Sequence, residues 1–146
     1  MKVKAYLDTN VLMDVLQEGR PASACSRMIL QAVLDRKIEA VLSSQSVVDA
    51  SYIAQKAGIR QDFFNTVDKC CDYLNMDQIS TSDLRWACQN YSGDFEDDVQ
   101  LSRALDTCCD VFVTNDRQFR ARQEGKHKLL RFMSPEEFVS KMKGQA

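Results

Sequence analysis

Residues 3–14 read Val-Lys-Ala-Tyr-Leu-Asp-Thr-Asn-Val-Leu-Met-Asp, a short apolar run that ends at an acid and continues with helical spacing. The first five of these residues have the composition of a buried strand, which ends at Asp8. Residues 10–17 then place their apolar side chains at the spacing of one helix face. A strand that leads directly into a helix is typical of a protein built on a parallel sheet.

The same alternation continues along the chain. Further strands are predicted at 38–42, 76–79, 111–114 and 129–133. Helices are predicted at 23–37, 45–57, 60–74, 84–91, 95–108 and 115–122, with a last one that opens at Ser134 and Pro135. The pattern predicts an α/β fold: a three-layer sandwich with a mainly parallel central sheet and helices on both faces. No linker or repeat divides the chain, so we expect residues 1–146 to form a single domain.

The composition of the 146 residues is that of a folded globular chain, with 45% apolar and 27% charged residues, five glycines and two prolines. Disordered and collagen-like classes are excluded by these proportions. No apolar run approaches the roughly 20 residues that cross a bilayer, and the start lacks the apolar stretch of a signal peptide. We therefore expect a cytoplasmic protein with no membrane partner.

Six cysteines occur, two pairs of them adjacent. Reduced thiols are expected, because the chain is large enough to fold without disulfides and carries no export signal. The adjacent pairs and the single His127 do not have the spacing of a zinc site. We expect Cys70, Cys88 and Cys108 to be buried in helix cores.

Four carboxylates from separate segments are candidates for one site. Asp8 follows the first strand, and Asp116 follows the strand at 111–114 by two positions. Asp49 and Asp97 lie in the early turns of two predicted helices. Each acid alone has an ordinary role at a strand end or a helix start. Ligands of parallel sheets bind at the carboxyl ends of the strands, and acids that gather there need a cation, for which oxygen ligands favour Mg²⁺ or Mn²⁺.

Basic residues concentrate just after Asp116. Six cations and one acid between positions 117 and 131 give this segment a local charge of +5, although the whole chain has a net charge of −2. The candidates for binding an RNA backbone are Arg117, Arg120, Arg122, Lys126 and Lys128. The alternative interpretation of this segment is a solvated surface.

The chain resembles PIN-domain ribonucleases, especially compact prokaryotic ones that include toxins of toxin–antitoxin pairs. The resemblance spans nearly the whole chain and is carried by the order and spacing of several motifs. These are Tyr-Leu-Asp-Thr-Asn-Val-Leu-Met-Asp at 6–14, Arg20-Pro21, Ser-Val-Val-Asp-Ala-Ser-Tyr-Ile at 46–53, Asp-Phe-Glu-Asp-Asp-Val-Gln at 94–100 and Val-Phe-Val-Thr-Asn-Asp at 111–116.

The resemblance implies a function for these motifs. It implies that Asp8, Asp49, Asp97 and Asp116 bind Mg²⁺ or Mn²⁺, and that Asn10 and Thr114 fix water or phosphate. It also implies hydrolysis of single-stranded RNA to a 5′-phosphate and a 3′-hydroxyl, an antitoxin partner and a homodimer. Two ions about 4 Å apart are one arrangement that supports such an in-line attack.

Two positions depart from the family pattern. Position 49 is Asp where Glu is common, and the shorter side chain predicts a contact with metal through water. Position 98 is Asp where a small apolar residue is usual. The neighbours Asp94 and Glu96 compete with Asp97 as the third ligand.

Other functions fit the sequence less well. A haloacid-dehalogenase-like phosphatase needs a second acid where this chain has Asn10, and a receiver domain needs adjacent acids at the end of its first strand. The five glycines are too far apart for a nucleotide-binding loop. The alternative that stays open is a catalytically inactive PIN-like module that binds RNA or protein.

Overall fold

Five short strands form one parallel sheet in the computed structural model, which describes residues 2–144. Along the sheet the strands lie in the order β3-β2-β1-β4-β5. Their bounds are β1 Lys4–Leu7, β2 Glu39–Ser43, β3 Asn75–Asp77, β4 Val111–Val113 and β5 Arg131–Met133. All four pairings are parallel, as the sequence predicts.

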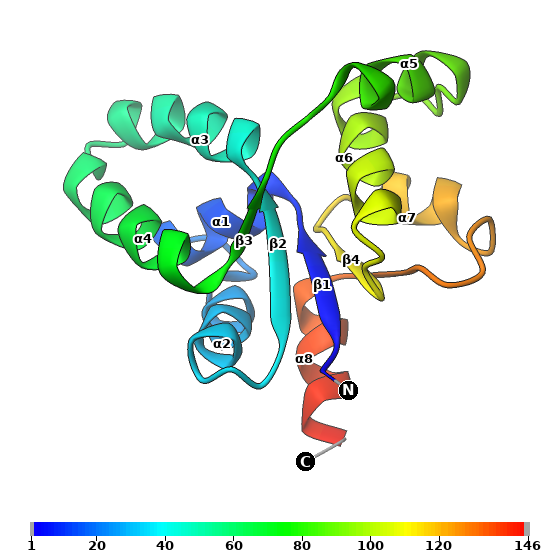
Figure 1. Cartoon of the computed structure of the whole chain (residues 1–146). Helices are drawn as coiled ribbons and strands as arrows, with labels where there is room; N and C mark the ends of the chain where they lie inside the picture. The colour runs from blue at the N-terminus through cyan, green and yellow to red at the C-terminus, as the bar shows by residue number, and fades with distance from the viewer. Residues whose placement is uncertain (1, 145–146) are drawn as a thin grey trace.

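Eight helices are described, and they cover both faces of the sheet. Figure 1 shows α1 to α4 on one side and α5 to α7 on the other. The bounds are α1 Thr9–Leu16, α2 Ser23–Leu34, α3 Ser44–Lys56, α4 Arg60–Tyr73, α5 Thr81–Gln89, α6 Phe95–Asp106, α7 Arg117–Gln123 and α8 Pro135–Gly144. The predicted three-layer sandwich is therefore confirmed.

The alternation of side chains along β1 divides the core between the two faces. Ala5 and Leu7 join the larger cluster beneath α1, α2, α3, α4 and α8, whereas Tyr6 points into the cluster formed with α6 and α7. Tyr6 stacks on Phe112 with ring centroids 5.1 Å apart, and Phe119 packs on Phe112 at 5.2 Å. Both faces of the central strand are thus buried, which is usual for a parallel sheet.

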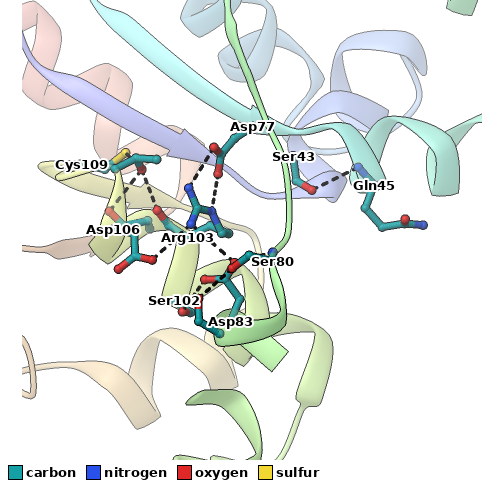
Figure 2. A network of polar contacts seen from close by, with 12 residues as sticks. Ser43, Gln45, Asp77, Ser80, Asp83, Ser102, Arg103, Asp106 and Cys109 are labelled. Carbon is teal, nitrogen blue, oxygen red and sulfur yellow. Dashed lines mark hydrogen bonds and ion pairs between the residues drawn. The ribbon is translucent and has the colours of Figure 1, made fainter. Parts of the chain in front are cut away.

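A half-buried arginine fixes the α5–α6 layer to the edge of the sheet. Arg103 on α6 donates twice to Asp77 at the end of β3, at 2.6 and 3.0 Å, and contacts Asp83 on α5 at 3.5 Å. Asp83 also accepts from the Ser102 hydroxyl at 2.7 Å and from the Ser80 backbone at 2.8 Å (Figure 2). Burial acts to raise the pKa of Asp83, but these donors and Arg103 outweigh it and hold that pKa below its usual range.

The cysteines agree with the prediction of free thiols, with one correction. No disulfide occurs among the six, and Cys70 is buried in α4 as predicted. Cys88 and Cys108 are exposed, so their predicted place in helix cores is wrong. The helix α6 ends at Asp106, and Cys108 takes a positive φ of 56°, which directs Cys109 into the core instead.

No helix within residues 2–144 combines the length and apolar character needed to cross a membrane.

Removal of the Arg103 guanidinium tests the anchoring network. We expect Arg103→Ala to lower the free energy of unfolding by about 3 kcal/mol, because it leaves the buried Asp83 without its charge partner. The exposed Arg85 on α5 is the matched control, and Arg85→Ala should change stability by less than about 0.5 kcal/mol. Equal losses in urea unfolding for the two variants would contradict this role.

Candidate active site

Asp8 is held at the carboxyl end of β1 by three donors. Its Oδ1 accepts from the backbone N–H of Thr9 at 2.6 Å, and its Oδ2 accepts from Asn10 Nδ2 at 2.9 Å and from Thr114 Oγ1 at 2.6 Å. The carboxyl group caps α1 and is only 5% exposed. Burial raises the pKa of Asp8, and the donors act against that shift. Asn10 and Thr114, predicted to fix water or phosphate, are thus seen to fix Asp8.

Asp116 follows β4 and begins α7. Its Oδ1 accepts from the Phe119 backbone at 3.0 Å, and its own N–H donates to Thr114 Oγ1 at 3.1 Å. Thr114 therefore connects Asp116 to Asp8 through a single hydroxyl group.

Asp97 reaches the same place from the other layer. Asp94 caps α6 by accepting from the Asp97 backbone at 3.1 Å, which sets Asp97 in the first turn of that helix. Asp97 is 8% exposed, and its Oδ2 is buried without a hydrogen-bond partner. Burial, the carboxylates of Asp8, Asp94 and Asp116, and close contact with Asp116 raise the pKa of Asp97 to about 8. Three of the four predicted acids therefore influence one another directly.

Asp49 lies farther out than the other three acids. Ser43 caps α3 by accepting from the Gln45 backbone at 3.2 Å (Figure 2), and Asp49 follows in the second turn with an exposed side chain. Its Oδ1 accepts from Gln45 Nε2 at 2.9 Å. Burial and the charges of Asp8, Asp49 and Asp94 raise the pKa of Glu96. The charges of both Asp8 and Asp49 thus act on Glu96, which the sequence offered beside Asp97 as a candidate for the third ligand.

Another buried acid, Asp14, supports the site from behind. Asp14 is 1% exposed and binds Arg20 Nε at 2.8 Å, Ser26 Oγ at 3.0 Å and Asn115 Nδ2 at 2.6 Å. Asn115 lies between Thr114 and Asp116, so Asp14 holds the turn that carries both. In the sequence, Asp14 and Arg20 stand out only as parts of motifs. The supporting role of Asp14 was missed because the ion pair between these two residues was not expected.

Asp98 has a structural role that explains its departure from the family pattern. The side chain is fully buried, and its two oxygens accept from the backbone and the hydroxyl group of Ser92, at 2.8 and 2.5 Å. Asp98 therefore anchors the loop before α6. Because both of its oxygens are engaged by Ser92, it is not a candidate metal ligand.

Buried oxygen atoms without hydrogen-bond partners lie around Asp8 and could serve as ligands of a cation. Thr9 Oγ1, Asp97 Oδ2 and Gln100 Oε1 are buried without a partner, and Gln100 also contacts Asp8. Within residues 2–144, no group of three or more His, Cys, Asp or Glu side chains is gathered closely enough to enclose a metal ion. Mg²⁺ needs only one or two carboxylates because it keeps much of its water. The contacting carboxyl groups of Asp97 and Asp116 fit that requirement.

The basic residues after Asp116 differ in their surroundings. Arg117 is exposed at the start of α7, and Lys126 and Lys128 are exposed in the loop that follows this helix. Arg120 donates to the Thr114 carbonyl oxygen at 2.6 Å, and Arg122 is half-buried against the Phe119 ring, 5.9 Å from its centroid. Arg120 and Arg122 thus make contacts within the protein.

One family model matches the chain. The model of the PIN domain matches residues 4–118. No curated protein sequence gives a significant match.

Several solved structures share the fold. PAE2754 from Pyrobaculum aerophilum superimposes with a TM-score of 0.66 at 15% identity, over 98% of this chain and 91% of that one. The sarcin-ricin loop cleaving toxin VapC20 from Mycobacterium tuberculosis gives 0.65 at 7% identity, over 80% and 93%. A toxin–antitoxin complex from Klebsiella pneumoniae gives 0.60 at 19% identity, over 83% and 91%.

The raised pKa of Asp97 predicts how stability depends on pH when EDTA removes divalent ions. The folded protein holds this proton more tightly than the unfolded chain, so the stability it contributes is lost as the pH rises from about 4 to about 8. Asp97→Asn has no proton to lose there. We therefore expect its melting temperature to exceed that of the wild type at pH 8 and to match it near pH 4.

The exposed Asp68 on α4 provides the control for this experiment, because Asp68→Asn should follow the wild type at every pH. A wild-type advantage over Asp97→Asn at pH 8 in EDTA would contradict the mutual repulsion of these carboxylates.

Proposed function

The chain belongs to the PIN domain family, and we propose that it is a metal-dependent endoribonuclease that hydrolyses phosphodiester bonds of single-stranded RNA. The observation that carries this proposal is the approach of Asp8, Asp97 and Asp116 at the carboxyl edge of the sheet, with one oxygen of Asp97 buried and unpartnered. Acids in such an arrangement repel RNA, so a cation must act between them and the phosphate.

The proposed division of labour follows from the contacts. Asp97 and Asp116 would hold Mg²⁺ or Mn²⁺, with Asp8 behind them and Asp49 contributing from the rim through water. Such an ion would supply positive charge that polarises a phosphoryl oxygen and favours ionisation of an attacking water. Asp8 cannot turn away, because Asn10 and Thr114 hold its Oδ2. The products expected from the family resemblance are a 5′-phosphate and a 3′-hydroxyl.

RNA contacts are proposed for the exposed cations. Arg117 directly follows Asp116, so its guanidinium group is the one nearest the proposed site along the chain. Lys126 and Lys128 would extend this contact along the RNA phosphate backbone. Contacts of this kind depend on charge and carry little sequence preference. Arg120 and Arg122 would act by holding α7 in place.

We further propose that the protein is the toxin of a toxin–antitoxin pair. The similar structure from Klebsiella pneumoniae is a toxin–antitoxin complex. An antitoxin segment would then cover the acids around Asp97. The homodimer stays a prediction from the resemblance.

A catalytically inactive module that binds RNA or protein is the second candidate. The exposed position of Asp49 favours it, since only three of the four acids approach one another closely. Cleavage assays separate the two candidates directly.

Cleavage of labelled single-stranded RNA tests the enzyme proposal. We expect Mg²⁺- or Mn²⁺-dependent cleavage that EDTA abolishes and that Asp97→Asn slows at least about 100-fold, because the variant loses charge at the reacting centre. Asp97→Asn is the sharpest variant, since it is expected to fold at least as stably as the wild type in EDTA. Asp68→Asn should cleave normally. Equal cleavage by Asp97→Asn and the wild type would overturn the site, and binding without cleavage would favour the inactive module.

Salt-dependent binding tests the assignment of the cations. In Ca²⁺, we expect Arg117→Ala to weaken RNA binding and to reduce the slope of log affinity against log salt by about 0.7, the loss of one phosphate contact. Lys69→Ala on α4 should leave the slope unchanged. An unchanged slope for Arg117→Ala, measured by fluorescence anisotropy, would show that this residue does not contact RNA.

A further inference from the structure

A groove of about 1110 Å³ lies at the end of the sheet opposite to Asp8. Its lining includes the residues just before four of the parallel strands, such as Val3 before β1 and Ile38 before β2. Parallel strands start at one edge, so these segments share the amino edge of the sheet. The helices α2 and α8 supply the walls, and Figure 1 shows α8 extending past the start of β1.

Part of the lining of this amino-edge groove is apolar. Ile38 and Val139 belong to the core and reach the groove with their outer surfaces. Leu129 is 90% exposed and Met28 42% exposed along the same lining. Exposure of each of these apolar side chains to water costs free energy. Apolar surface gathered in a groove marks an interaction site more often than isolated exposed residues do.

The rim of the groove is basic. Its five cations are Lys2, Lys37, Arg131, Lys141 and Lys143. None of them forms an ion pair with another residue in the part of the chain from 2 to 144.

The two acids of the lining are already engaged within the chain. Asp35 accepts from Gln31 Nε2 at 3.0 Å, and Asp110 accepts from the Lys4 backbone at 2.8 Å. The groove thus has a local charge of +3 in a chain with a net charge of −2. Unpaired cations around an apolar floor are complementary to acidic groups that flank apolar ones.

We propose that the amino-edge groove docks a segment of another protein whose apolar side chains are flanked by Asp or Glu. A second copy of this chain in a two-fold contact would bring the basic rims against each other. Nucleic acid would pair its phosphates with the rim but would leave Leu129 and Met28 in water. Only an acidic amphipathic segment satisfies both features. The inference does not depend on the nuclease proposal, because the groove shares no residue with that site.

Binding of a designed peptide tests this proposal. The probe is a fluorescein-labelled amphipathic peptide with leucines at helical spacing and glutamates at the other positions, and its partner probe has lysines in place of the glutamates. We expect the glutamate peptide to bind the full chain and Lys37→Glu or Lys141→Glu to weaken it about tenfold, since each reverses a rim charge. Leu129→Ser should weaken binding while leaving the fold intact, because this side chain is 90% exposed.

The control variant is Lys69→Glu, which makes the same change of charge on α4 outside the groove. Equal weakening by Lys69→Glu would overturn the proposal, because it would show attraction to net charge alone. Equal binding of the lysine peptide, absence of binding, or displacement of the peptide by single-stranded RNA would also overturn it. A dimer in light scattering that Leu129→Ser abolishes would assign the groove to a second copy instead.

Discussion

The parallel register of β1 with β4 pairs Leu7 with Val113, and the positions that follow these residues share one edge of the sheet. Thr114 can therefore donate to Asp8 at 2.6 Å and accept from the Asp116 backbone at 3.1 Å. The other residues of the site are positioned around these two strand ends. The helix α6 brings Asp97 from above, and Asp14 supports the turn around Asn115 from behind.

Gathering these carboxylates in a buried place costs free energy, and a bound cation would remove that cost. Burial and neighbouring carboxylates raise the pKa of Asp97, so the folded protein without metal favours a proton there. A fold selected only for stability would place an amide at such a position. Sites where local rules of stability are broken are commonly functional. The Arg103 network shows the opposite case, since each acid around this half-buried guanidinium group finds a donor.

The sequence predicts the parts of this structure that depend on local pattern. The positions of Asp8 and Asp116 could be expected because both come soon after apolar strands, and that of Asp97 because it lies in the first turn of a helix. Contacts between distant segments were not predictable, such as Arg103 with Asp77 or Arg120 with the Thr114 carbonyl oxygen. Cys108 was misplaced because the end of α6 and its positive φ have no clear signal in one sequence. The role of Asp49, the single-domain boundary and the metal stay predictions.

We propose that Asp97 and Asp116 bind a divalent cation at the carboxyl edge of the sheet. A crystal grown at saturating Mn²⁺ tests it most directly, through the anomalous scattering of manganese. We expect an anomalous peak in contact with oxygens of both residues in the wild type and its loss in Asp97→Asn. A peak elsewhere, or an unchanged peak in the variant, would show that these two residues do not bind the ion.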